Sequence, residues 1–413
     1  MRPVSADNAL APRDMQAPLK VLLVEDDPGD AHLVRRALSK SSSPRFIVEH
    51  VENLAAGIRA LETQDGFDVV LLDLSLPDSF GMQTLVSMQA AASRLPIVIM
   101  TGHDDPEFAQ HMLEAGAQDY LIKTGDPGMM VTRAIRYAIT RMTAQIERQI
   151  LTEQVLEHQR SLMQELALAR GMQFDLLPAA AKLNPTLQRL GVGVEACFEP
   201  SSSIGGDLWG CIKFDDERIA FYTFDFSGHG VGAALNVFRL HALIADRWTS
   251  DHQPGELLET LGGMLHGLLR RGQFATMFLG VLDCAANELS WASAGAPSPL
   301  LIQDGASAFI DSRGMPLGLV KSATYPTRRV SFPIGASLLL YSDAITEAEN
   351  ADGKMLGEDG LLDLVHNTLD GSARLRVEPF LNAFRAGVKL PLQDDLTAVC
   401  ITRLRQTEPG GAA

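Results

Sequence analysis

The most constraining feature of this sequence is a long stretch near its middle that has the pattern of one helix. Apolar residues recur there at spacings of three and four, and neither proline nor glycine occurs between Gly128 and Gly171. A helix of this length extends roughly 70 Å at ~1.5 Å per residue, which is too long to be buried against one domain. The stretch therefore predicts a linker between two domains. The length of 413 residues agrees, since single cores stop growing near ~250–300 residues.

The apolar stripe of this helix indicates a pairing surface. It consists of two parts, offset from each other, at Ile135, Ile139, Met142, Ile146 and Ile150, and at Val155, Leu162, Leu166 and Ala169. A sparse stripe with an offset is typical of a coiled-coil seam that contains a stutter. We expect residues 126–177 to form a coiled-coil linker and the chain to be a parallel homodimer through residues 130–170. The alternative is a monomer whose helix folds back on its own domains.

Charge and hydropathy argue against several kinds of partner and location. The net charge of −16 disfavours nucleic acid or an anionic membrane as the main partner, because both are polyanions. The N-terminus lacks an apolar core of signal-peptide length, and no stretch is long and apolar enough to span a bilayer. We therefore expect a cytoplasmic protein, with residues 1–18 as a disordered leader and residues 406–413 as a disordered tail.

Residues 19–125 alternate short apolar runs with segments of helical spacing. The runs at 20–24, 67–72, 96–100 and 121–122 each end in polar residues. Such alternation predicts a doubly wound parallel sheet, and such sheets place functional groups at the carboxyl ends of their strands. The polar residues at these ends are Glu25, Asp26, Asp73, Thr101 and Lys123.

The chemistry of these residues indicates a phosphorylation site. The carboxylates of Asp26 and Asp73, with Glu25 nearby, repel one another unless a divalent cation such as Mg²⁺ joins them. A lysine supplies a compact cation for the oxygens of an added phosphoryl group, and a threonine hydroxyl can hydrogen-bond to that group.

This part of the chain resembles the receiver domain of two-component response regulators, whose fold is a doubly wound parallel five-stranded sheet. The resemblance implies a phosphoacceptor at Asp73, Mg²⁺ ligands at Glu25, Asp26 and Asp73, and phosphoryl contacts and a switch at Thr101, Lys123 and Tyr120. It also implies a histidine kinase or phosphotransfer protein as a partner. The alternative is a receiver that keeps these residues but is no longer phosphorylated.

Residues 178–405 carry β-like runs separated by Gly, Pro and Asp, with helical patterns at 231–247, 254–270 and 358–369. This order predicts an α+β sandwich rather than a second parallel sheet. Carboxylates stand where apolar runs begin or end, at Asp207, Asp225, Asp343 and the pair Asp394 and Asp395. Such acids, if brought together, are costly without cations, and a ligand set of oxygens alone favours two Mg²⁺ or Mn²⁺ ions.

These runs resemble the PPM family of metal-dependent serine/threonine phosphatases, in its SpoIIE and RsbU branch. Matching stretches occur in family order, among them GGD at 205–207, DFSGHG at 225–230 and DDLTAV at 394–399. The resemblance implies a β-sandwich flanked by helices, with two cations at one edge. It implies ligands at Asp207, Asp225, the carbonyl of Phe226, Asp343 and Asp394, with Asp225 and Asp207 as the catalytic centre. Water activated by the cations would attack phosphorus.

The chain departs from the family at Ser342-Asp343-Ala344, where the family usually has Thr-Asp-Gly. Alanine keeps the acid but restricts the backbone, which would weaken the second cation site. His229, in the Gly-rich turn, lacks an obvious triad partner. We expect it to be structural or to support the ligands, and protonation of the leaving oxygen is the alternative.

The two resemblances together predict a response regulator that removes phosphate from serine or threonine of a protein. By family analogy the substrate is an anti-sigma-factor antagonist. The layout is also similar to RssB-like regulators, so the alternative is an adaptor, weak or inactive as an enzyme, that binds a sigma-pathway protein under receiver control. Retention of all four phosphatase acids favours the enzyme.

Overall fold

The computed structural model describes residues 17–41, 43–102, 106–123, 128–228, 230–249, 252–370 and 374–405. His229, the expected tail at 406–413 and all but residues 17 and 18 of the expected leader lie outside these ranges. The chain divides into two units, residues 1–159 and residues 160–413.

The first unit is built on a parallel sheet of five strands in the order β2-β1-β3-β6-β7. Its strands are β1 (Leu19–Val24), β2 (Phe46–Val51), β3 (Val69–Asp73), β6 (Ile97–Thr101) and β7 (Asp119–Ile122). The intervening helices are α1 (Pro28–Ser39), α2 (Leu54–Thr63), α3 (Met82–Ala91) and α4 (Pro106–Glu114). A small hairpin of β4 (Ser75–Leu76) and β5 (Ser79–Phe80) follows β3. The predicted doubly wound five-stranded sheet is confirmed.

Both faces of this sheet are buried, as expected for strands that are continuous apolar runs. On β3, Val69 and Leu71 pack with α1 and with the start of the following long helix, while Val70 and Leu72 pack with α2 and α3. The alternating side chains of each strand therefore pack into two separate cores, one on each face of the sheet.

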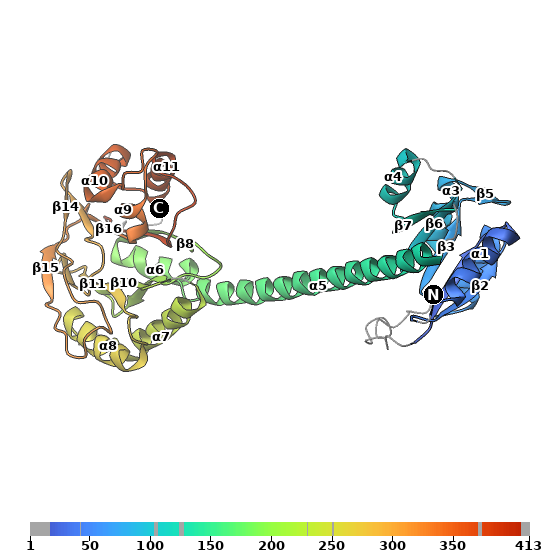
Figure 1. Cartoon of the computed structure of the whole chain (residues 1–413). Coiled ribbons are helices and arrows are strands. Elements are labelled where there is room, and N and C mark those ends of the chain that lie inside the picture. Colours follow the sequence, from blue (N-terminus) through green and yellow to red (C-terminus); the bar gives the residue numbers. More distant parts are fainter. Residues whose placement is uncertain are drawn as a thin grey trace, which may run out of the picture. The chain divides into compact units, whose positions relative to one another are not determined.

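The long helix α5 (Gly128–Phe174) is unbroken over 47 residues, which confirms the predicted long helix (Figure 1). It ends at Phe174 rather than near Leu177, because the chain there tightens into a turn in which the Leu177 amide bonds to the Phe174 carbonyl. None of the described helices, α5 included, has the apolar character over sufficient length that crossing a membrane requires.

The first turns of α5 belong to the core of the first unit. Val131, Ala134, Ile135 and Ala138 are all buried there, against the sheet. Ile135 therefore cannot contribute to the predicted pairing seam, which was expected to begin with it. Only from Ile139 onward are the stripe residues partly or fully exposed.

The second unit contains two antiparallel sheets of five strands, in the orders β15-β12-β11-β10-β9 and β14-β13-β16-β17-β8. The first comprises β9 (Asp207–Lys213), β10 (Arg218–Phe226), β11 (Ala275–Asp283), β12 (Glu288–Ser293) and β15 (Arg328–Ser331). The second comprises β8 (Val192–Glu199), β13 (Leu300–Gln303), β14 (Ala306–Phe309), β16 (Ser337–Tyr341) and β17 (Leu396–Arg403). The helices are α6 (Ala180–Leu190), α7 (Val231–Arg247), α8 (Pro254–Leu268), α9 (Asp343–Glu347), α10 (Gly357–Thr368) and α11 (Val377–Gly387).

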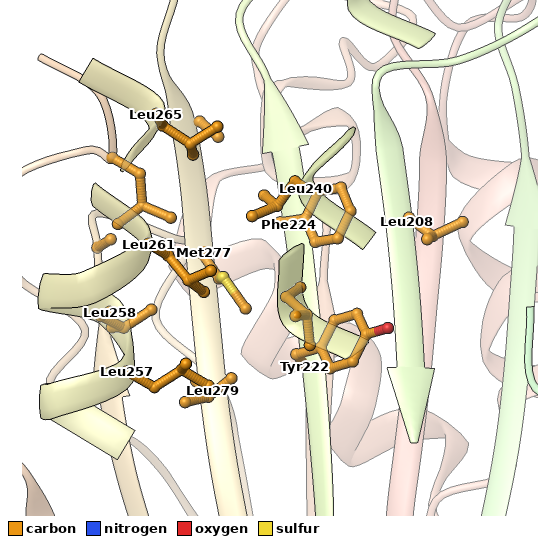
Figure 2. Close-up of a cluster of buried hydrophobic side chains, with 14 of the residues drawn as sticks. Leu208, Tyr222, Phe224, Leu240, Leu257, Leu258, Leu261, Leu265, Met277 and Leu279 are labelled. Carbon is orange, nitrogen blue, oxygen red and sulfur yellow. The ribbon is translucent and has the colours of Figure 1, made fainter. Parts of the chain in front are cut away.

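The two sheets pack face to face, and helices cover their outer faces, α7 and α8 on one side and α9, α10 and α11 on the other. The period of two along each strand builds these layers. On β10, Tyr222 and Phe224 face α7 and α8, as Figure 2 shows, while Ile219 and Phe221 face the other sheet. The predicted β-sandwich flanked by helices is confirmed.

Strand β9 was not predicted from the sequence, because its pattern is broken by glycine and polar residues. The glycine has a packing reason. A Cβ at Gly210 would lie 2.2 Å from the ring of Tyr222, the residue that pairs with Gly210 on β10. Helices α6 and α11 were also missed, since each contains a proline, Pro185 and Pro379.

The start of helix α8 lies so close to the backbone of the segment before β15 that only glycine fits there. A Cβ on Gly255 would lie 1.9 Å from the carbonyl oxygen of Tyr325, and the Gly255 amide donates to Thr327 Oγ1 at 3.0 Å. Near the other end of α8, a Cβ on Gly267 would have no neighbour within 4 Å.

These two glycines give a matched pair of stability variants. We expect Gly255→Ala to destabilise the second unit by about 1–3 kcal/mol, because backbone must move to admit the methyl group. Gly267→Ala should be neutral or stabilise by up to about 1 kcal/mol. Urea unfolding followed by tryptophan fluorescence measures this unit alone, since all three tryptophans (Trp209, Trp248 and Trp291) lie within it. Equal midpoints for the two variants would contradict the close approach.

Candidate active site

The candidate site lies where the apolar inner face of the sandwich ends. The alternation that points Ile219 and Phe221 inward on β10 continues to Thr223 and Asp225 at the end of that strand. Neighbouring strands do the same, with polar residues continuing the inward positions of β9, β11, β16 and β17 at Asp207, Thr276, Ser342 and Thr397. The alternation of side chains along the strands therefore places apolar residues in the core and polar residues at its end.

Asp207 and Asp225 lie directly opposite each other on neighbouring strands. Burial raises the pKa of Asp207 well above its usual range, and the charge of Asp225 raises it further. Burial also raises the pKa of Asp225 to about 7, and the charge of Asp343 adds to the effect. These two acids, one buried and one partly buried, oppose each other's ionisation, so the pair favours binding a proton or a cation.

A hydroxyl network fixes Asp207 from the other sheet. Thr397 Oγ1 donates to Asp207 Oδ2 at 2.6 Å. The Thr397 amide donates to Ser342 Oγ at 2.9 Å, and that hydroxyl donates to the carbonyl of Asp395 at 2.7 Å. These residues were not predicted as site residues, although Thr397 stands in the quoted DDLTAV stretch.

The structure gives the two neighbouring acids before β17 different tasks. Asp395 is buried, and its carboxylate accepts from the amides of Gly206 at 2.6 Å and Ser201 at 2.7 Å. A Cβ on Gly205 would lie 2.3 Å from that carboxylate, which explains the first glycine of the Gly-Gly-Asp turn. Asp395 thus holds the turn. The side chain of Asp394 is exposed, and its Oδ1 accepts from the Asp395 amide at 2.8 Å, which leaves Oδ2 to a ligand.

Asp343 is the first residue of α9 and is partly buried. Burial raises its pKa, and the charges of Glu347 and Asp394 add to the effect. Ala344, where the family usually has glycine, lies inside α9 with a helical backbone. The expected restriction by alanine is therefore absent, because a helix accepts alanine without strain.

The carbonyl oxygen of Phe226 lies beside the Asp207–Asp225 pair. A Cβ on Gly206 would be 3.0 Å from that oxygen and 3.3 Å from Asp225 Oδ1. The Phe226 amide in turn donates to the Gly206 carbonyl at 3.1 Å. The second glycine of the Gly-Gly-Asp turn therefore permits a close approach of backbone to the acids.

Gln173, at the end of α5, is fully buried against the same turn. Its amide nitrogen donates to the Gly205 carbonyl at 2.9 Å, and its amide oxygen accepts from the Gly205 amide at 3.1 Å. A longer contact reaches the carbonyl of Asp207 at 3.4 Å. This residue was not predicted, and the only signal in the sequence was an uncharged polar residue within an otherwise amphipathic helix end.

A pocket of about 310 Å³ opens at this end of the sandwich. It brings together three of the four predicted acids, Asp207, Asp225 and Asp343. Asp394 does not line it, but its charge raises the pKa of both Asp225 and Asp343, after burial in each case. None of the described residues that line the pocket is Lys, Arg or His.

The second candidate site lies in the first unit, at the carboxyl edge of the parallel sheet. Lys123 follows β7, and its Nζ lies 2.8 Å from Asp73 Oδ2, 2.7 Å from Glu25 Oε2 and 3.1 Å from Asp30 Oδ2. Burial lowers the pKa of Lys123, but the hydrogen bonds to Asp73 and Glu25 outweigh it and leave the pKa above its usual value. Asp30 was not predicted.

The acids of this edge suit a divalent cation. Ligand oxygens of Glu25, Asp26 and Asp73 lie within 4.8 Å of one another, and in the described part of the chain no other set of three acids or histidines does so. Burial raises the pKa of Glu25 to about 7 despite Lys123. Thr101 ends β6 and is buried, with its carbonyl accepting from the Lys123 amide at 2.7 Å, and Tyr120 lies partly buried in β7.

Comparison with known proteins gives one family model for each of the two units. The family model "Response regulator receiver domain" matches residues 21–135, and the model "Stage II sporulation protein E (SpoIIE)" matches residues 215–404. Among solved structures, the SiaA-PP2C domain of Pseudomonas aeruginosa is 19% identical with a TM-score of 0.52, over 60% of this chain and 98% of that one. At this identity the likeness shows the fold alone.

Two curated relatives each match somewhat less than half of the chain. Phosphoserine phosphatase RsbP of Bacillus subtilis is 27% identical over 189 residues, 44% of this chain and 45% of that protein, so the chain spans about half of its length. Swarming motility regulation protein RssB of Serratia marcescens is 30% identical over 195 residues, 45% of this chain and 84% of that protein. The chain therefore belongs to the response regulators, and it combines a receiver domain with a phosphatase domain of the SpoIIE type, a branch of the PPM family.

Proposed function

We propose that this response regulator is a metal-dependent phosphoserine and phosphothreonine protein phosphatase, controlled by phosphorylation of Asp73. The observation that carries the proposal is the pairing of Asp207 with Asp225 at the open end of the sandwich, in a pocket whose described lining has no basic residue. The name of RsbP, a phosphoserine phosphatase, supports the substrate class.

The donor set of the phosphatase site suits two divalent cations in its chemistry, although no three of its described acids bring ligand oxygens within 4.8 Å of one another. Asp207 and Asp225 resist ionisation together, and a cation would remove that cost. The donors offered are the carboxylates of Asp207, Asp225, Asp343 and Asp394 and the carbonyl of Phe226, all oxygens, which suits Mg²⁺ or Mn²⁺. Glu25, Asp26 and Asp73 of the receiver offer the same chemistry to one Mg²⁺.

The hydroxyl side chains of this site hold other groups in position and do not serve as nucleophiles. The Thr397 hydroxyl fixes one oxygen of Asp207 and so leaves the other to a ligand. Ser342 is bonded through its hydroxyl on both sides, to Thr397 and to the carbonyl of Asp395, and is not placed as a nucleophile. Two bound cations would lower the pKa of water and neutralise the phosphate oxygens, which is the chemistry that hydrolysis of a phosphate ester needs.

The protein substrate we favour is a phosphorylated anti-sigma-factor antagonist, as in the family resemblance. The alternative, an adaptor without turnover, requires loss of the metal acids in the usual case. Here three of them line one pocket, and Asp394 stands beside it with its carboxylate exposed. This arrangement favours the enzyme.

Control by the receiver requires a connection from Asp73 to the second unit, and α5 supplies a continuous one. Its first turns are packed in the receiver core through Val131 and Ile135, and its last turn carries Gln173 into the Gly205 turn. Between them, exposed apolar residues such as Leu151, Val155 and Leu162 remain without a partner in the described part of the chain. We propose that these residues pair two copies of α5 in a parallel homodimer, and that phosphorylation alters this pairing.

Replacing the central acid tests the enzyme. We expect Asp225→Asn to reduce Mn²⁺-dependent hydrolysis of p-nitrophenyl phosphate and of a phosphoserine protein by at least about 100-fold, because a cation ligand is lost. Asp246→Asn, which removes an exposed acid from α7, should leave both rates within twofold. Full activity of Asp225→Asn, or none in the folded, metal-loaded wild type, would refute the proposal.

The raised acid pKa predicts how pH affects the metal-free protein. With a pKa of about 7 when folded and about 3.9 when unfolded, Asp225 binds more protons in the folded state between these values. Stability in EDTA should therefore fall as pH rises from about 4 to 7. The thermal midpoint from tryptophan fluorescence should show this slope in wild type and a smaller slope in Asp225→Asn. Mn²⁺ should raise the midpoint most at the upper end. A midpoint that rises with pH across this window would contradict the site.

Beryllofluoride, which mimics the phosphoryl group on Asp73, tests the coupling. We expect it to change the phosphatase rate in wild type and in Gln164→Ala, whose side chain is exposed on α5, but not in Gln173→Ala, which lacks the contacts to Gly205. Sedimentation should give the mass of two chains. An unchanged rate and unchanged pairing in wild type would exclude this route of control, and the mass of one chain at micromolar concentration would exclude the dimer.

A further inference from the structure

The pocket at the end of the sandwich extends beyond the acids that suit the cations. Its far lining comes from the segment before β13, from β16 and α9, and from the first turn of α10, with Pro297, Ser298, Tyr341, Thr346 and Glu358 among the residues. A phosphate group alone needs only the end at Asp225. The remaining space is therefore available to the part of a substrate that carries the phosphate.

Glu358 is the one acid of the described lining that lies in α10, and its side chain is exposed. Within the described residues, no hydrogen bond or ion pair joins Glu358 to a neighbour. Asp207, by contrast, accepts from Thr397. The Glu358 carboxylate is therefore open to a ligand on the pocket wall.

The charge of Glu358 acts on a different part of the pocket from that of the cation acids. After burial, the carboxylates that raise the pKa of Asp225 are Asp343, Asp394 and Asp395. Glu358 instead raises the pKa of Tyr341, again after burial, and the Tyr341 hydroxyl donates to the Ser298 carbonyl at 2.9 Å. Glu358 thus faces the Tyr341 wall and is not one of the acids gathered at Asp225.

We propose that Glu358 is a specificity residue, which selects protein substrates with a lysine or arginine close to the phosphorylated serine or threonine. This inference rests on the proposed phosphatase function and names the class of substrate for it. With the phosphate at the Asp225 end, the neighbouring substrate residues pass the Glu358 wall. A basic side chain there gains an ion pair, and an acidic one is repelled, since no described lining residue is basic.

Two phosphoserine peptides, identical except for Arg or Glu at the residues flanking the phosphoserine, test the proposal. We expect wild type to prefer the Arg peptide in kcat/KM by about twofold to fivefold, the size that one exposed ion pair gives. Glu358→Gln should reduce this ratio towards one, and Glu358→Lys should reverse it. Asp359→Asn removes the same charge from the next residue of α10, which does not line the pocket, and should keep the wild-type ratio. The preference should also weaken at high salt.

The outcomes of these experiments distinguish the specificity proposal from the phosphatase function on which it rests. Hydrolysis of p-nitrophenyl phosphate by wild type establishes the phosphatase independently of the peptides. If it occurs and the wild-type ratio is one, or if Asp359→Asn lowers the ratio as much as Glu358→Gln, the proposal is wrong. It is also wrong if Glu358→Gln only raises the Mn²⁺ concentration required by both peptides, because Glu358 is then a cation ligand. Without hydrolysis, calorimetry with phosphonate analogues of the two peptides gives the same ratio as an affinity.

Discussion

The second unit depends on the alternation of side chains along its strands. Inward positions of β10 read Ile219, Phe221, Thr223 and Asp225, so the same face changes from core to site within a few residues. Because the strands of both sheets end together, polar residues from β9, β11 and β17 meet Asp225 there. The apolar part of each strand holds the backbone rigid, and this rigidity keeps two acids close although they oppose each other's ionisation.

The two units differ in how they offset the negative charge of closely spaced carboxylates. In the receiver, the ammonium group of Lys123 lies within 3.1 Å of three acids and offsets part of their charge. In the phosphatase domain, the described lining of the pocket has no basic residue, and hydroxyl and amide donors only orient the acids. The first arrangement therefore includes a counter-charge supplied by the chain itself, and the second has none among the described lining residues.

Sequence patterns singled out the acids because each one follows or begins an apolar run. They could not separate Asp394 from Asp395, since both precede β17, and the difference lies in which one faces the Gly206 amide. Gln173 and Thr397 were missed for a similar reason. Each makes its contacts with residues tens to hundreds of positions away, at Gly205 and Asp207, and a lone glutamine or threonine gives no periodic signal. For Glu358, the sequence offered no indication of function beyond its position at the start of a predicted helix.

The sequence by itself determined the parallel sheet, the unbroken α5 and the sandwich, because apolar periodicity and the placement of Gly and Pro are local properties of the chain. Where those elements meet was decided only by the tertiary structure. Ile135 is buried against the sheet and therefore lies outside the predicted coiled-coil seam. Pairing of β9 with β10 places Asp207 opposite Asp225. Burial then changed the pKa of both acids, and burial depends on the three-dimensional surroundings of a side chain rather than on its neighbours in sequence.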